Sequence, residues 1–223
     1  MTRATRTPAL KDAYHHGRLR RALMDEALRR TAAHGIDGWS MREVSAALGV
    51  THAAPYHHFR DRAGLVAAIA REGLDLMDAR MAASQAAAGA DPLVQLLAIG
   101  LAYVTFAVER PDYYAAIAAG PKPGHDGSAL DADPAEGGGA TWQRLMRAVA
   151  ACQEAGCLPA TDTVIVAVNL WSLVHGLAEL WKAGPLQQLP HASRGLVPLA
   201  EQVLRAAVVA ARPPSATRTR RTR

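Results

Sequence analysis

The chain has 223 residues, of which 50% are hydrophobic and only 5% aromatic, and its formal net charge is +5 at pH 7. This length allows one or two domains with a real core, and the lack of long stretches alternating apolar and polar residues excludes a mainly β protein, so we expect an all-α fold. Residues 1–62 carry 11 Lys/Arg and 6 Asp/Glu, whereas residues 63–211 carry 9 and 14, and residues 212–223 carry 5 and 0. A cationic N-terminal quarter is typical of proteins that contact phosphate backbones, although a charge run is more often a solvated face.

Membrane insertion, export and metal chemistry are not indicated. Met1–Leu10 is polar and basic, unlike a signal peptide, so we expect a cytoplasmic protein with no membrane partner. The longest apolar stretch, Val164–Leu180, is interrupted by Asn169, Ser172, His175 and Glu179. Cys152 and Cys157 stand five apart without a second pair, which we interpret as buried thiols rather than a metal or redox site. No cofactor and no metal are predicted.

The chain begins with a basic segment, Met1–Gly17, that has no apolar periodicity and predicts a mobile arm. Such an arm either contacts phosphates, enters a minor groove or is simply a disordered terminus. The first helix is predicted over Arg18–His34, with Leu19, Leu23 and Ala27 on its inner face, and it ends at Gly35.

The next segment, Ser40–Phe59, predicts two short helices joined by a tight turn. Ser40 and Glu43 have the spacing of a capping box, so the first helix begins at Met41. Gly49 ends it and supplies the backbone freedom that a helix–helix turn needs. Thr51 is the expected cap of the second helix, which carries rings and small side chains but no acid.

A helix-turn-helix of this kind places its second helix in the major groove of DNA. We expect Phe59 and its neighbour His58 to pack in the small core rather than bind a ligand. The predicted DNA-contacting residues are Ser40, Arg42, Thr51, His52, Ala53, Tyr56, His57 and Arg62.

These residues resemble the DNA-binding domain of the TetR family of bacterial transcriptional regulators over Arg18–Gly73. The motif that carries the resemblance reads Met41-Arg42-Glu43-Val44-Ser45, then Gly49-Val50-Thr51, Tyr56-His57-His58-Phe59, and Asp61 with Arg62. The resemblance implies a homodimer that binds a palindromic operator in double-stranded DNA. It also implies repression relieved by a small-molecule effector, with activation left open.

The sequence departs from the family pattern at four positions. Ser45 and Leu48 stand where alanine is usual, Pro55 where an aliphatic residue is usual, and Gly64 where an acid is usual. Proline near the start of a helix removes at most the first intrahelical hydrogen bond, so we expect Pro55 to shorten the second helix without excluding it.

The remaining elements follow from caps and breakers. Asp61 caps a connector helix that runs toward Ala83, and Gly120–Gly139 is predicted to be a loop or lid. Further helices are predicted at Pro92–Arg110 (capped by Asp91), Tyr113–Ala119, Ala140–Ala155, Thr163–Ala183 and Pro198–Ala211.

The segment Trp171–Gly176 resembles a C-terminal domain type of the same family that is named for its Trp, His and Gly residues. That resemblance implies a ligand cavity in each subunit. The aromatic residues could line an apolar cavity with His175 as its polar group, or could be ordinary core. The candidates are Tyr103, Phe106, Tyr113, Tyr114, Trp142, Trp171 and His175.

The helical wheel of Thr163–Ala183 places Trp171 on the core face and His175 in a polar seam. We expect this seam to pair with a second subunit, together with one face of the last helix that carries Leu199, Val203, Ala206 and Ala207.

The sequence therefore predicts an N-terminal three-helix helix-turn-helix domain (residues 18–83, motif 40–59), preceded by the arm at 1–17. A helical-bundle ligand-binding and dimerisation domain follows at 84–211, with a basic disordered tail at 212–223. An enzyme is disfavoured because we find no catalytic triad, glycine-rich phosphate loop or metal spacing. A ligand-independent architectural DNA-binding protein remains as the other alternative.

Overall fold

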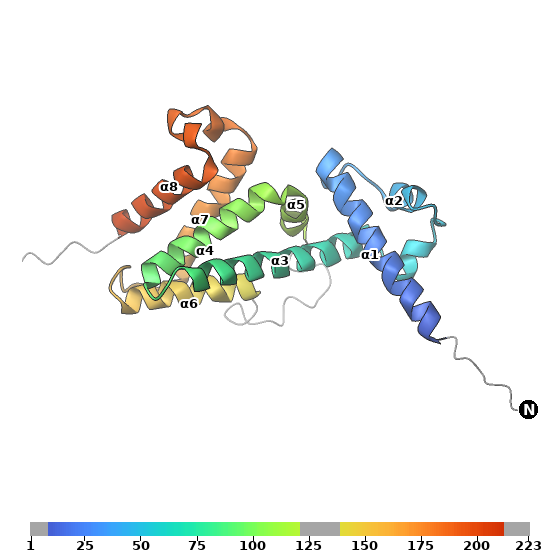
Figure 1. Ribbon diagram of the computed structural model, residues 1–223, viewed down its shortest axis with the longest axis horizontal. Helices are drawn as coiled ribbons and strands as arrows, with labels where there is room; N and C mark the ends of the chain where they lie inside the picture. The colour runs from blue at the N-terminus through green and yellow to red at the C-terminus, as the bar shows by residue number, and fades with distance from the viewer. Residues whose placement is uncertain (1–8, 121–138, 212–223) are drawn as a thin grey trace, which may run out of the picture. The chain divides into compact units, whose positions relative to one another are not determined.

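The computed structural model describes residues 9–120 and 139–211, and within these residues every regular element is a helix (Figure 1). In chain order the elements are α1 (Ala9–His34), α2 (Met41–Ala47), η1 (Ala54–His57), α3 (Arg62–Ala87), α4 (Pro92–Glu109), α5 (Pro111–Ala119), α6 (Ala140–Glu154), α7 (Thr163–Lys182), η2 (Pro185–Gln188), η3 (Pro190–Arg194) and α8 (Leu196–Ala211). The all-α prediction is confirmed. The tail, most of the predicted loop and the first residues of the predicted arm lie outside the described residues.

The contacts between elements divide the chain into two compact units. The first contains α1, α2, η1, the part of α3 up to Asp75, and α5. The second contains the rest of α3 from Leu76, then α4, α6, α7, α8 and the two short 3-10 helices. The backbone thus passes from the first unit to the second within α3, and returns between Glu109 and Arg110.

Helix α1 begins at Ala9, nine residues before the predicted start at Arg18. The stretch after Pro8 contains good helix formers such as alanine, leucine and lysine, which extend a helix outward without an apolar stripe. The predicted start of this helix is therefore wrong, and the mobility of residues 1–17 stays a prediction. The helix ends as predicted, with Gly35 at a φ of 78°.

Helix α2 begins with the predicted capping box. The Ser40 hydroxyl accepts from the Glu43 N–H at 3.3 Å, and the Glu43 carboxylate accepts from the Ser40 N–H at 2.8 Å. The helix ends before Gly49, whose φ of 66° is one that side-chain-bearing residues rarely adopt.

The core of the first unit forms where the apolar faces of α1, α2 and α3 meet, and it is closed by Phe59. Trp39 is buried with them, and its indole N–H donates to the Thr31 hydroxyl at 2.9 Å, so its one polar group is satisfied. The most buried apolar side chains here are Leu23, Met24, Ala27, Leu28, Met41, Val44, Leu65, Val66 and Ile69.

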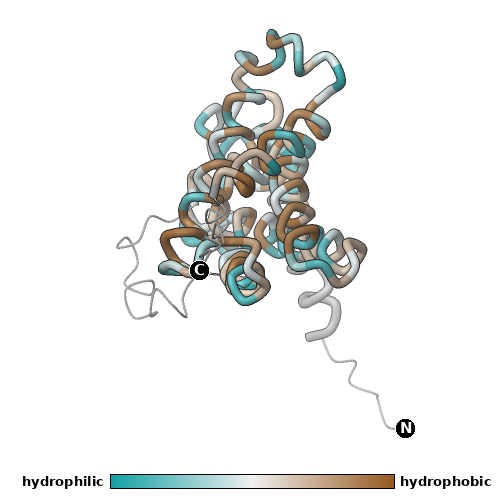
Figure 2. Tube along the Cα trace, turned by 90° about the vertical axis from the view of Figure 1, so that its left-hand side faces the viewer, coloured by the Kyte–Doolittle hydropathy of each residue, from teal (hydrophilic) through white to brown (hydrophobic). Residues whose placement is uncertain are grey.

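The second unit is built around α4, which packs against α6, α7 and α8. Asp91 caps α4 as predicted, accepting from the Leu93 N–H at 2.8 Å. A Cβ at Gly100 would lie 3.1 Å from Leu204 and 3.5 Å from Val174, so this glycine allows α7 and α8 to approach α4 closely. Figure 2 shows hydrophobic and hydrophilic residues alternating along the helices, as expected of helices that bury one side.

Helices α4 and α7 are long and apolar enough to cross a membrane by length and composition alone. Both pack against other helices of the second unit, and α7 carries the polar residues noted above, so we interpret them as core helices. The wheel assignment of α7 is confirmed for the buried Val174 and Leu177. It is wrong for Trp171, whose side chain is 47% exposed.

Candidate functional site

The second half of the helix-turn-helix is a 3-10 turn, η1, rather than an α-helix. Its hydrogen bonds run from residue i to i−3: Ala54 N–H to Thr51 (3.0 Å), Tyr56 to Ala53 (3.1 Å) and His58 to Pro55 (2.9 Å). The prediction that an α-helix survives here is wrong. Pro55 lacks an N–H and is buried, so the chain tightens into a 3-10 turn around it.

The predicted cap by the Thr51 side chain is also not formed. The residue at the N-cap position of η1 is Ala53, which makes no side-chain cap hydrogen bond. Since Thr51 contributes only its carbonyl to the turn, its hydroxyl is not used as the cap of η1.

Seven of the eight predicted DNA-contacting side chains are exposed on the α2–η1 segment. Tyr56 is 55% exposed although it is a large aromatic residue, because burial of its neighbour Pro55 turns it outward. The other exposed members are Ser40, Arg42, Thr51, His52, Ala53 and His57. Exposed aromatic, hydroxyl and basic groups with no acid among them suit contacts to DNA phosphates and bases.

Arg62, the eighth candidate, is half-buried and engaged within the unit. Its guanidinium donates to the backbone carbonyls of Ile36 and Trp39, the latter at 3.2 Å. It also stacks 4.4 Å from the centre of the Trp39 ring. Through these contacts Arg62 stabilises the loop that precedes α2. The phosphate contact predicted for Arg62 stays a prediction.

Arg60 is a cation that the sequence analysis did not single out. Its side chain is 91% exposed, and its ion pair with Asp61 is 3.4 Å long. Its exposure could have been predicted from its position directly after the buried Phe59, because the side chain that follows a core residue points away from the core.

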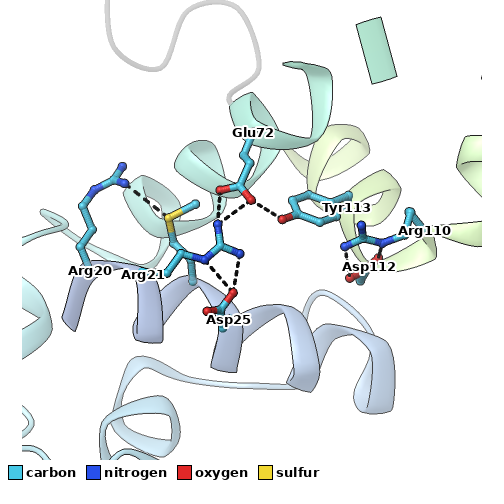
Figure 3. Close-up of polar contacts among 8 residues, drawn as sticks. Arg20, Arg21, Asp25, Glu72, Arg110, Asp112 and Tyr113 are labelled. Carbon is cyan, nitrogen blue, oxygen red and sulfur yellow. Dashed lines mark hydrogen bonds and ion pairs between the residues drawn. The ribbon is translucent and has the colours of Figure 1, made fainter. Parts of the chain in front are cut away.

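A polar cluster in the first unit joins α1, α3 and α5 (Figure 3). One Nη of Arg21 donates to both carboxylate oxygens of Glu72, at 2.6 and 2.8 Å, while the Tyr113 hydroxyl donates to the same carboxylate. Arg21 also donates to Asp25 one turn along α1, at 2.8 Å. Burial opposes ionisation of Glu72, but these donors outweigh it and lower the pKa of Glu72.

Close packing brings α5 against α3 at this cluster. A Cβ at Gly73 would lie 3.0 Å from the Tyr113 ring, so any larger residue would require the tyrosine to shift. The guanidinium of Arg110 covers the ring at 4.3 Å and pairs with Asp112 at 3.3 Å. Burial, followed by the hydrogen bond to Glu72, raises the pKa of Tyr113.

The predicted ligand-binding residues separate into two groups. In the second unit, the Tyr103 hydroxyl lies 3.2 Å from Nδ1 of His175, and the His175 ring lies 6.4 Å from that of Trp171. Trp142 meets Trp171 edge to face, with ring centres 6.0 Å apart. Phe106 is buried on α4, whereas Tyr113 and Tyr114 belong to the first unit, where Tyr113 is tied to Glu72.

Comparison with family models assigns both parts of the chain. Residues 23–69 match the model described as bacterial regulatory proteins, tetR family, and residues 96–207 match a tetracyclin repressor-like C-terminal domain. The chain belongs to the TetR family of bacterial transcriptional regulators. Its α2–η1 segment is accordingly the DNA-binding helix-turn-helix of this TetR-family chain.

Known proteins agree with this assignment. A curated HTH-type transcriptional repressor from Mycobacterium tuberculosis, Rv1474c, is 38% identical over 65 residues, which are 29% of this chain and about a third (35%) of that relative. A protein of unknown function from Rhodococcus sp. RHA1 is 30% identical, covering 88% of this chain and 95% of that one, with a TM-score of 0.70.

A further solved structure shares the TetR-family fold. AibR in complex with isovaleryl coenzyme A and operator DNA is 21% identical over 87% of this chain and 98% of its own, with a TM-score of 0.55.

Proposed function

We propose that this chain is a ligand-responsive transcriptional repressor of the cytoplasm, released from a palindromic operator by a small apolar or aromatic molecule. The observation that carries the proposal is the exposed turn at residues 51–57, which contains no acidic residue and in which Thr51 and Tyr56 face solvent, together with the exposed Arg42 on α2. Support comes from the related repressor and from AibR, whose structure contains both an acyl-CoA and operator DNA.

The residues that we expect to contact base edges of DNA are Thr51, His52, Ala53 and Tyr56. Their short 3-10 turn presents few residues, so we expect a short half-site. Ser40, Arg42 and His57 are candidates for phosphates, with Arg60 as an added one. Arg62 positions the loop before α2, and it is a further candidate for a phosphate contact.

Of the two groups of predicted ligand-binding residues, the group in the second unit is the better candidate for binding the effector. It consists of Tyr103, Trp142, Trp171 and His175. Its rings supply apolar and stacking surface, and the Tyr103–His175 pair supplies a polar group that fixes orientation. The same residues support assignment of the C-terminal domain to the Trp-His-Gly type, since Trp171, His175 and Gly176 lie on one helix.

Dimerisation would use α7 and α8, which carry large apolar side chains in contact with solvent. Ile165 is 65% and Val209 is 63% exposed, and Val164, Val168, Leu180 and Val197 add to the apolar surface. Burial of such surface against a second copy is the usual reason for its presence. Leu199, which we expected at the interface, is instead buried within its own chain.

The experiment is selection of DNA from a random-sequence pool by the full-length protein. We expect inverted repeats whose half-sites lie about 34–36 Å apart, or a multiple of that spacing. Thr51→Ala and Tyr56→Ala should reduce the preference for the selected site, whereas Arg147→Ala, an exposed cation on α6, serves as the control. Recovery of sequences without any consensus would favour the architectural alternative.

Release is then tested on the selected site with isovaleryl coenzyme A and with aromatic acids as the first probes. Tyr103→Phe and His175→Gln should weaken release without changing affinity for DNA. Glu179→Gln, one turn from His175 on the same helix, is the matched control. If no probe releases DNA and the C-terminal unit binds none of them, the effector part of the proposal fails while DNA binding stands.

A further inference from the structure

The two cysteines of the chain meet at the C-terminal end of α6. The helix ends with Ala155 at the C-cap and Gly156 next, at a φ of 72°. The Cys157 N–H donates to the Cys152 carbonyl at 2.9 Å, and the Gly156 N–H donates to the Gln153 carbonyl at 3.0 Å. These two bonds define a Schellman motif, which brings the side chains of its first and last residues, here Cys152 and Cys157, into contact.

We propose that Cys152 and Cys157 form a reversible intramolecular disulfide when a hydroperoxide oxidises the protein. The proposal rests on this pair of thiols alone and does not depend on the repressor function. It gives the turn between α6 and α7 a covalent state that the reduced chain lacks.

The backbone separation of the two cysteines is compatible with the bond. The Cys152 Cα lies about 2.4 Å from its carbonyl oxygen and the Cys157 Cα about 1.5 Å from its nitrogen, as standard covalent geometry requires. With the hydrogen bond of 2.9 Å between that oxygen and nitrogen, the two Cα atoms are at most about 6.8 Å apart. Disulfides span Cα separations of about 4.4–6.8 Å, so the pair lies within reach.

The two thiols differ in accessibility, which sets the order of steps. Cys152 is fully buried, whereas Cys157 is half-buried. Burial raises the pKa of the Cys152 thiol to about 12, and the nearby Cys157 sulfur adds to the effect. Cys152 is therefore protonated at neutral pH, and Cys157 is the thiol that meets an oxidant first.

The chemistry balances with a hydroperoxide as the two-electron oxidant. The Cys157 thiolate attacks one oxygen of hydrogen peroxide, the O–O bond breaks, and Cys157 becomes a sulfenic acid. Hydroxide is the leaving group, and it takes up the proton that the Cys157 thiol released to become the first water. The Cys152 sulfur then attacks the sulfenic sulfur, the S–O bond breaks, and a second water leaves with the Cys152 proton. Two thiols and one hydrogen peroxide thus yield one disulfide and two waters.

The bond would fasten a turn that side chains already hold. The Gln153 amide donates to the carbonyls of Pro159 and Thr161, both at 2.9 Å, and its oxygen accepts from the Thr163 hydroxyl at 2.8 Å. Leu158 is buried directly after Cys157. Oxidation therefore adds a covalent link to the segment that leads into α7, the helix of Trp171 and His175.

The test uses the full-length protein, treated with hydrogen peroxide in modest excess, then denatured and alkylated with iodoacetamide. Intact-mass measurement should show a chain that has lost two hydrogen atoms and takes up no alkyl group, and dithiothreitol should restore two alkylation sites. The chain has only these two cysteines, so this product identifies the bond. Two alkylated thiols after treatment, or a disulfide-linked dimer on a non-reducing gel, would overturn the proposal.

Two variants separate the order of steps. Cys152→Ala should stop at a sulfenic acid on Cys157 that dimedone labels, and Cys157→Ala should leave Cys152 unmodified. A measurement on the parent protein does not depend on either variant folding: native labelling with a maleimide should modify Cys157 alone, and Cys152 only after unfolding. Equal labelling of both thiols in the native protein would contradict the assigned order.

Discussion

Arg21 on α1 holds Glu72 on α3 through both oxygens of its carboxylate, at 2.6 and 2.8 Å. The same carboxylate receives the hydroxyl of Tyr113 from α5, so one ionised group joins three helices of the first unit. Helix α5 directly follows α4, the central helix of the second unit. Tyr113 therefore lies just after the point at which the chain returns from the second unit to the first.

The first prediction concerns acid stability. The pKa of Glu72 is lower in the folded protein than in the unfolded chain, where it is about 4.3. Its contribution is therefore fully present above that unfolded value and is lost as pH falls through the folded pKa. Glu72→Gln should lower the free energy of unfolding by about 1 kcal/mol at pH 7, after allowance for partial exposure.

The measurement is urea unfolding at pH 7 and at pH 3. The difference between Glu72→Gln and the parent should shrink at the lower pH, because Glu72 then binds a proton in the unfolded chain that folding to the ionised form must release. Asp25→Asn is the control, since Asp25 meets Arg21 only within α1. An unchanged difference at both pH values would show that the charge of Glu72 is not what joins the helices.

The second prediction separates two neighbouring arginines. Arg60→Ala should weaken binding to all DNA sequences about equally and lower the salt slope by about one unit, with little effect on stability, because Arg60 is exposed. Arg62→Ala should instead lower the thermal midpoint of the protein, since the loop carbonyls of Ile36 and Trp39 lose their donor.

Both variants are compared by fluorescence anisotropy on DNA at several salt concentrations and by thermal unfolding. Because Arg62 was also predicted to contact phosphate, its variant is expected to lower the salt slope as well. A sequence-selective loss at Arg60 would mean that this residue reads bases.

The third prediction concerns the subunit interface. Val209→Glu on α8 and Ile165→Glu on α7 should give monomers, because each places a charge in apolar surface that a second copy would bury. Val203 and Ala207, the positions favoured by sequence, are only half-buried and should respond more weakly. Light scattering reports the mass, and Gln143→Glu, which adds the same charge at an exposed polar position on α6, is the control. Dimers that persist in both variants would place the interface elsewhere.

The fourth prediction concerns alkaline stability under reducing conditions. The pKa of Cys152 is raised to about 12 in the folded protein, against about 8.5 in an unfolded chain. Between these values the unfolded state loses a proton that the folded state keeps, so stability falls as pH rises, by at most about 1.4 kcal/mol per pH unit. The profile of Cys152→Ala between pH 8 and pH 10 should be flatter than that of the parent, whereas Cys157→Ala should retain the slope.

Local signals in the sequence were sufficient for most helix boundaries. The capping box at Ser40 and Glu43, the glycines at 35 and 49, and the aspartate caps at 61 and 91 all act within a few residues of where they stand. The start of α1 at Ala9 was missed because helix propensity alone extends that helix, without the apolar stripe used to find it. The DNA-facing candidates were chosen by the same local reasoning, and seven of them are exposed.

The sequence by itself determined the helical class, the order of helices and the position of the helix-turn-helix, because caps, breakers and apolar periodicity are local properties. Only the tertiary structure decided that Arg62 faces the Trp39 loop, that Tyr113 joins Glu72 rather than the other aromatic candidates, and that Trp171 is half exposed. Each of these depends on which distant helix supplies the neighbour. Neighbouring residues in the sequence do not indicate which distant helix this will be, because it depends on how all the helices pack together.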